Sequence, residues 1–225
     1  MKKSKISEDN MFFGIDLTDE QKEFRDAIYG DDYNIVFCNA KAGTGKTLIA
    51  VATAKILYEE GKYDGLVYIV NPVQEQSQGY LPGDISEKTM PYAAPLEQAL
   101  IKANEQPEKA IKQLCGNINV KEGRGWVDCI SHTFTRGINF ENKIIILDEM
   151  QNAYLDECKK ILTRAHDNCK VICIGHTEQN DLYKNPERSG FQKYLEHFST
   201  QSRCKVCTLT KNFRGWISQW ADELN

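Results

Sequence analysis

The 225-residue sequence lacks several features that would assign it to a class of protein at once. It has no apolar run long enough to span a bilayer, and its opening, MKKSKISEDN, lacks the apolar centre of a signal peptide. It contains no internal repeat and no low-complexity tract. These absences argue against a membrane or secreted protein, and we expect a cytoplasmic protein without a membrane partner.

The sequence also has fewer basic than acidic residues, and few histidines. Lys and Arg number 28 against 32 Asp and Glu, so the formal net charge is −4. This balance argues against a surface built wholly for nucleic acid, although a local basic groove remains compatible with it. The four histidines show no metal-binding spacing, and no basic-aromatic motif of an RNA-binding module occurs.

The eight cysteines are expected to be free thiols, because no secretion signal accompanies them. Cys204 and Cys207 have the spacing of a metal-binding pair. A second pair that would complete a tetrahedral zinc site is missing, so we expect no metal there.

What the sequence does contain is an alternation of short apolar runs and amphipathic helical patterns. Strands alternating with helices predict a mostly parallel central sheet with helices on both faces, an α/β fold. The length suits one such domain. The runs expected to be strands are Tyr33–Cys38, Gly65–Val70, Gly125–Ile130, Lys143–Asp148, Lys170–Gly175 and Cys204–Leu209.

Two segments depart from the alternation. Residues 1–14 are expected to form a flexible N-terminal tail, and residues 15–225 a single domain. Within that domain, residues 71–125 open with a polar loop, continue through GYLPGD and then show helical stretches as far as Leu114. We interpret residues 71–125 as an insertion that lies at the sheet edge or over a bound nucleotide.

The run AKAGTGKT, Ala40–Thr47, predicts a phosphate-binding loop. A strand precedes it, and a helix from about Lys46 to Glu60 follows. Gly43 and Gly45 allow the backbone to curl so that successive N–H groups point at phosphate oxygens, next to the positive end of the helix. Ala40 stands where this loop has its first glycine.

The loop predicts that ATP and Mg²⁺ are the cofactors. Lys46 is expected to reach the β- and γ-phosphates, and the Thr47 hydroxyl to ligate Mg²⁺. The residues expected to bind the nucleotide are Ala40, Lys41, Ala42, Gly43, Thr44, Gly45, Lys46, Thr47 and Leu48.

A pair of acids follows the apolar run in KIIILDEMQN. Asp148, at the end of a central strand, is expected to hold Mg²⁺ through water. Glu149 is placed to orient and deprotonate an attacking water. Because phosphate binding alone needs no second acid, the pair indicates hydrolysis.

With these residues in hand, the chain resembles the PhoH-like family of ATPases, relatives of the first core domain of superfamily-1 helicases. The resemblance runs from Leu17 to Asn225. GYLPGDISEKTMPYAAPL resembles the family's GFLPGD…EK…PY…P segment, ILDEMQN resembles LDEAQN, and IGHTEQNDL resembles GDxxQxDL. It implies a RecA-like P-loop NTPase fold and helicase-like ATP hydrolysis coupled to action on RNA or single-stranded nucleic acid. It also implies a ring-shaped homo-oligomer, a hexamer.

The resemblance also assigns roles. Gln21 would read adenine, unless it is a plain surface glutamine. Gln179 would sense the γ-phosphate, and Arg214 would reach that phosphate from the same chain, unless it makes an ordinary salt bridge. A second arginine would come from a neighbouring subunit; Arg164 is favoured over Arg136, although a salt bridge within the domain is equally compatible with the sequence.

The sequence departs from the family pattern at His176, where the family has aspartate, and at Met150, where it has alanine. No arginine occurs between Arg25 and Arg124, where the family is expected to have one. The His176 departure favours an alternative function, a nucleotide-dependent regulator that assembles and hydrolyses little ATP. A small-molecule kinase is the third possibility, which the acid pair disfavours.

Trp216 and Trp220 lie four residues apart in WISQWADEL, on one face of a predicted amphipathic helix. Such residues can stack on nucleic-acid bases. Packing in the core or at an interface is the interpretation that we favour.

Overall fold

The computed structural model describes residues 12–71, 85–114, 125–135, 137–178 and 189–222. GYLPGD, Arg136 and Gln179 lie outside the described residues. The helices are α1 (Asp19–Tyr29), α2 (Lys46–Glu59), α3 (Ile85–Lys102), α4 (Pro107–Ala110), α5 (Leu155–Leu162), α6 (Gly190–Ser199) and α7 (Trp216–Asp222), with 3₁₀ turns η1 (His132–Thr135) and η2 (Met150–Asn152). Among the described residues, no helix has the length and apolar character needed to cross a membrane.

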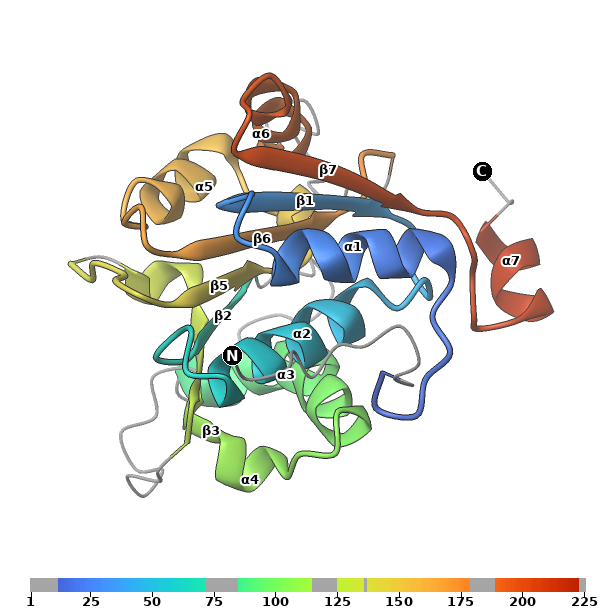
Figure 1. Ribbon diagram of the computed structural model, residues 1–225, viewed down its shortest axis with the longest axis horizontal. Helices are drawn as coiled ribbons and strands as arrows, with labels where there is room; N and C mark the ends of the chain where they lie inside the picture. The colour runs from blue at the N-terminus through green and yellow to red at the C-terminus, as the bar shows by residue number, and fades with distance from the viewer. Residues whose placement is uncertain (1–11, 72–84, 115–124, 136, 179–188, 223–225) are drawn as a thin grey trace.

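The strands are β1 (Ile35–Ala40), β2 (Leu66–Val70), β3 (Ile111–Leu114), β4 (Val127–Ser131), β5 (Ile144–Leu147), β6 (Lys170–Gly175) and β7 (Cys204–Leu209). They form one sheet in the order β3-β4-β2-β5-β6-β1-β7 (Figure 1). Every neighbouring pair is parallel, which confirms the predicted α/β class. The carboxyl ends of all seven strands therefore meet at one edge, where parallel sheets bind ligands.

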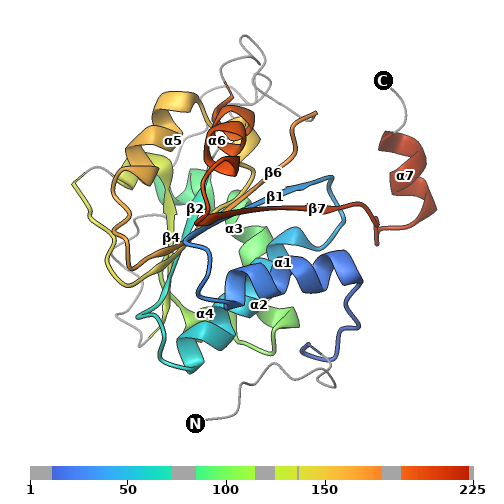
Figure 2. The same cartoon turned by 45° about the horizontal axis from the view of Figure 1, so that its top comes forward.

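Helices cover both faces of the sheet, as predicted. Along β1 the side chains alternate: Ile35 and Phe37 join the core cluster on one face, whereas Val36 and Cys38 join the cluster on the other. Helices α5 and α6 lie on the Phe37 face, and α1, α2 and α3 lie on the opposite face (Figures 1 and 2). Because both faces are buried, the strands consist of almost uninterrupted apolar runs.

Some residues of the expected insertion, 71–125, belong to the central sheet. Residues 111–114 were expected to be helical, but they form the edge strand β3, which pairs with β4. The Trp126 N–H donates to the Ala110 carbonyl oxygen (2.9 Å), so the residues that follow Pro107 are drawn into the ladder. Because α4 is only one turn long, the Ala110 carbonyl oxygen is free to accept from the neighbouring strand. Pairing with β4 then overrides the helical pattern of residues 111–114.

The described chain begins within the segment expected to be a tail. Phe12 is only 4 % exposed and packs in the main core cluster, and its carbonyl oxygen accepts from the Ile15 N–H (2.9 Å). The packed part of the chain therefore begins before residue 15.

Cys204 and Cys207 belong to core clusters on opposite faces of β7. Residues three apart in a strand point to opposite faces, so these two thiols cannot hold one ion together. Burial raises the pKa of Cys204 to about 11 and that of Cys207 to about 12. Both are therefore thiols at neutral pH and poor nucleophiles.

Candidate nucleotide-binding site

The phosphate-binding loop connects the end of β1 to the start of α2. Gly43 and Gly45 have φ values of 82° and 85°, in the left-handed region that glycine adopts without strain. Ala40 is still part of the extended strand β1, where a side chain causes no strain. The alanine at the loop's first position therefore needs no compensation.

The loop lysine and threonine meet the acid pair. The Thr47 hydroxyl donates to Asp148 Oδ2 (2.9 Å), and Lys46 Nζ lies 3.4 Å from Glu149 Oε1. About a hundred residues separate the two halves in sequence. They meet because β6 alone separates β1 from β5, which brings the carboxyl ends of these strands together.

Asp148 is a buried carboxylate with several hydrogen-bond donors around it. Its oxygens accept from the Tyr68 hydroxyl, the Thr47 hydroxyl and the Glu149 N–H. Burial and the neighbouring Glu149 raise its pKa, and Lys46 opposes the shift. A divalent cation would offset the cost of burying this charge, and hydroxyl and carboxylate oxygens are ligands that Mg²⁺ prefers. Thr47 and Asp148 therefore fit a magnesium ion.

Glu149 is held in an unusual conformation. Its φ of 48° and ψ of 42° place it in the left-handed region, which costs a non-glycine residue about 1–3 kcal/mol. Gln151 Nε2 donates to its Oε2 (2.6 Å), and Lys46 lies against its Oε1. Nevertheless the side chain is 47 % exposed. The carboxylate is fixed on both oxygens and is still accessible to a water molecule.

Three residues at the site escaped the sequence analysis. Tyr68 is 1 % exposed and donates to Asp148, and Asn71 Nδ2 donates to the Asp148 carbonyl oxygen (3.0 Å). Gln151 uses its amide twice: Nε2 holds Glu149, and Oε1 accepts from the His176 N–H (3.3 Å). Tyr68 sits in an apolar run and is indistinguishable there from a core residue. Gln151 was part of the ILDEMQN match, which was its only signal.

Gln21 is a buried residue whose side-chain amide contacts the phosphate-binding loop. It is 5 % exposed, and Nε2 donates to the Thr44 carbonyl oxygen in the phosphate-binding loop (2.9 Å). Its Oε1 accepts from the Thr18 N–H (3.1 Å) as half of the capping box of α1. Both ends of the amide are thus engaged by the protein.

The Arg214 side chain also lies against the phosphate-binding loop. The preceding Phe213 N–H donates to the Gly43 carbonyl oxygen (2.8 Å). A Cβ atom added at Gly43 would lie 2.9 Å from Arg214 Cγ, so only glycine leaves room for this arginine. The segment after β7 thus brings the aliphatic part of the Arg214 side chain against the loop.

Arg164 lies elsewhere. It follows α5, and the chain continues from it into the amino end of β6, the end of the sheet opposite the loop. Its Nε is buried without a hydrogen-bond partner among the described atoms. Arg164 is therefore not part of the site in its own chain.

The sheet order, the glycine loop and the acid pair define a P-loop nucleotide-binding protein of the RecA-like α/β class. The chain belongs to the family of PhoH-like proteins, whose model matches residues 15–221.

Curated relatives agree with this membership. The chain is 33 % identical to the protein PhoH of Escherichia coli over 166 residues, which cover 73 % of this chain and 44 % of that protein. It is 32 % identical to the protein PhoH2 of Bacillus subtilis over 202 residues, covering 86 % and 43 % respectively. The chain spans about half the length of the curated relatives it matches. Among solved structures, Bacteroides sp. Pif1 in complex with ADP-AlF4 aligns with a TM-score of 0.46 and 17 % identity, covering 92 % of this chain and 45 % of that one.

Proposed function

We propose that this protein is a Mg²⁺-dependent ATPase that couples ATP hydrolysis to action on RNA or single-stranded nucleic acid. The observation that carries the proposal is the meeting of Lys46 and Thr47 with Asp148 and Glu149 at the sheet edge. A cation, a hydroxyl and two carboxylates, one buried and one accessible, are the groups that hydrolysis of a magnesium-bound triphosphate requires.

The roles follow from these positions. Lys46 binds the β- and γ-phosphates, and Thr47 and Asp148 hold Mg²⁺, which neutralises phosphate charge when bound. Glu149, oriented by Gln151, accepts the proton of the attacking water. Arg214 stabilises the charge on the γ-phosphate from the same chain.

Gln179 senses that phosphate, as the family resemblance implies. Because Arg164 lies at the far end of its own sheet, its role as a second arginine requires a neighbouring chain in a ring, which we take to be a hexamer. The nucleic-acid substrate rests on the family resemblance, and the cytoplasmic location belongs to the same proposal.

The alternative, a regulator with little hydrolysis, was favoured by His176 in place of the family's aspartate. His176 contacts Gln151 through its backbone N–H. Any residue except proline supplies this donor, so the link that orients Glu149 does not depend on the side chain at position 176. The orientation of Glu149 is therefore compatible with hydrolysis, and the measurement of ATP turnover below decides between the two functions.

Phosphate release by the full chain tests the proposal. We expect Mg²⁺-dependent ATP turnover that EDTA abolishes and single-stranded RNA stimulates several-fold. Double-stranded DNA of matched length is the control polymer. ATP binding without turnover would favour the regulator, and turnover indifferent to every polynucleotide would remove the nucleic-acid half of the proposal.

Substitution of Gln21 distinguishes two roles: stabilising the phosphate-binding loop and recognising the adenine base. Because its amide holds the Thr44 carbonyl, Gln21→Ala should lower kcat/KM for ATP and for GTP by a similar factor, roughly 5- to 30-fold for a lost buried hydrogen bond. Steady-state kinetics with both nucleotides measure this. Gln192→Ala, on the exposed face of α6, is the control. A loss confined to ATP would show that Gln21 exchanges its partners and reads the base.

A further inference from the structure

Four of the seven large apolar side chains that are exposed in the described part of the chain gather at its end. Phe213 is 51 % exposed, Trp216 69 %, Ile217 76 % and Trp220 61 %. We call these four residues the α7 patch. The two indole rings lie 6.2 Å apart, and α7 stands away from the body of the molecule in both views (Figures 1 and 2). Trp216 and Trp220 are therefore not packed in the core that the described residues form, and a cluster of exposed apolar side chains of this kind marks an interaction surface.

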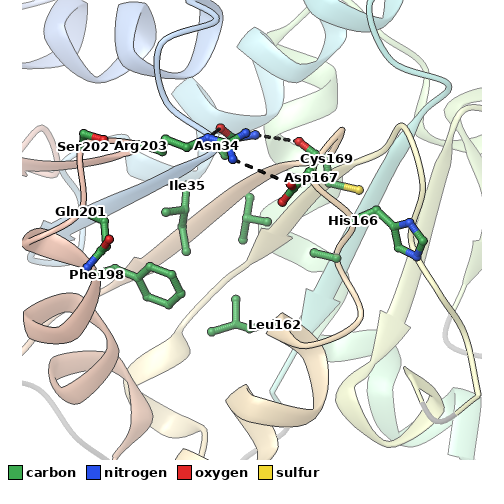
Figure 3. Close-up of a pocket in the computed structure, with 12 residues that line it drawn as sticks. Asn34, Ile35, Leu162, His166, Asp167, Cys169, Phe198, Gln201, Ser202 and Arg203 are labelled. Carbon is green, nitrogen blue, oxygen red and sulfur yellow. Dashed lines mark hydrogen bonds and ion pairs between the residues drawn. The ribbon is translucent and has the colours of Figure 1, made fainter.

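A cavity of about 310 Å³ lies at the amino ends of β1, β6 and β7, whereas α7 follows the carboxyl end of β7. Its apolar wall consists of Ile35, Leu162, Ala165, Val171 and Phe198 (Figure 3). Its rim is polar and includes Asn34, Asp167 and Arg203, which bond to one another. Ligand pockets begin at roughly 300 Å³, so an aromatic ring fits such a volume.

We propose that the α7 patch of one chain docks into this cavity on a second copy of the chain. The patch follows the carboxyl end of β7, whereas the cavity opens where β1, β6 and β7 begin. Six strand residues, roughly 20 Å, separate the two surfaces. Complementary surfaces at opposite ends of one molecule produce head-to-tail contacts, which close into a ring or continue as a filament.

A protein partner suits the patch better than a nucleic acid. The sequence of α7, WISQWAD, contains one acidic and no basic residue, so the helix itself offers a phosphate backbone no positive charge. Two basic residues, Lys211 and Arg214, lie next to Phe213 at the end of the patch that precedes the helix. Ile217, the most exposed of the four, has no aromatic face for a base to stack on. Aromatic anchors that enter an apolar pocket with a polar rim are typical of protein interfaces.

The contact area sets a limit. Two tryptophan side chains bury roughly 300–500 Å². A stable interface needs about 800 Å² on each partner. The cavity rim and the neighbouring turn after α5 must therefore contribute the rest.

That turn contains Arg164, between Leu162 and Ala165 of the cavity wall. On the other chain, α7 begins two residues after Arg214, whose side chain lies on Gly43 of the phosphate-binding loop. Docking thus brings Arg164 of one copy toward the nucleotide site of the next. The approach of Arg164 to a nucleotide site rests on the proposed function. The docking of the α7 patch does not depend on it.

Directional crosslinking tests the contact. Two single variants of the full chain, Ala221→Cys on α7 and Ser202→Cys on the cavity rim, are made in a Cys115→Ser background, since the other seven cysteines are buried. A short bismaleimide should join them only when the two proteins are mixed, because patch and rim then come from different copies. Ile101→Cys, at an exposed position of α3, replaces Ser202→Cys in the control mixture.

Light scattering on the full chain provides the second measurement. We expect a mass above that of one chain, and association weakened at least roughly tenfold by Trp216→Ala with Trp220→Ala. Ile101→Ala should leave it unchanged. Crosslinking of Ala221→Cys to itself, or a wild type that remains a monomer, would overturn the proposal. So would variants that assemble normally and lose single-stranded RNA binding.

The two proposals can fail separately. A monomer that hydrolyses ATP would leave the proposed function intact and refute the docking. A crosslinked assembly without ATP turnover would do the reverse.

Discussion

Glu149→Gln is expected to reduce ATP hydrolysis by about 10²–10⁴-fold, the contribution of a general base, while ATP remains bound. The amide has the shape of the carboxylate, so the bond from Gln151 Nε2 can pass to its carbonyl oxygen. What the change removes is the ability to accept a proton. Loss of the negative charge opposite Lys46 also reduces repulsion of the γ-phosphate, so affinity for ATP should stay equal or increase.

Single-turnover phosphate release and titration with a fluorescent ATP analogue measure the two effects separately. Glu141→Gln is the matched control, because Glu141 is a 67 % exposed carboxylate at the amino side of β5, away from the loop. Gln151→Ala should fall between control and Glu149→Gln, since it releases one oxygen of the base without removing it. A Glu149→Gln variant with more than half of the wild-type rate would contradict the assignment.

Lys46→Ala is expected to lower hydrolysis by at least about 10²–10³-fold and, unlike Glu149→Gln, to weaken ATP binding as well. The Lys46 side chain is 8 % exposed, and its ammonium nitrogen lies 3.4 Å from Glu149 Oε1. The attraction between a buried ammonium group and the expected phosphates is strong, because the local dielectric constant is low. Its loss therefore weakens both ATP binding and stabilisation of the transition state.

The fold should survive this change. Truncation leaves Glu149 without its cation, but that side chain is half exposed and solvent screens it. We therefore expect thermal unfolding of Lys46→Ala within a few degrees of the wild type. Lys102→Ala, in the last turn of α3, is the control for loss of one lysine. Retention of a tenth of the activity in folded Lys46→Ala would remove the loop from the mechanism.

The two variants together also distinguish between readings of the acid pair. If Glu149 acted only by fixing Lys46, its removal would copy the binding defect of Lys46→Ala. A general base instead predicts full binding with lost turnover. The kinetic profile, rather than the mere loss of activity, is the informative result.

The sequence by itself determined the loop and the strands beside it. The curl between β1 and α2 depends on a few adjacent residues, and glycine at positions 43 and 45 dictates the left-handed backbone there. Uninterrupted apolar runs likewise gave β2, β5 and β6, since strands covered on both faces contain little else. Such features are local, and so a contiguous stretch of sequence contains them whole.

Tertiary structure alone decided what those elements touch. It made residues 111–114 a strand by pairing them with β4, and it engaged both ends of the Gln21 amide. It put Arg164 at the end of its own sheet that is opposite the phosphate-binding loop. Tyr68 joined Asp148, 80 residues away, through the order of the strands. Contacts at that separation depend on which strands become neighbours, and no short segment of sequence carries that information.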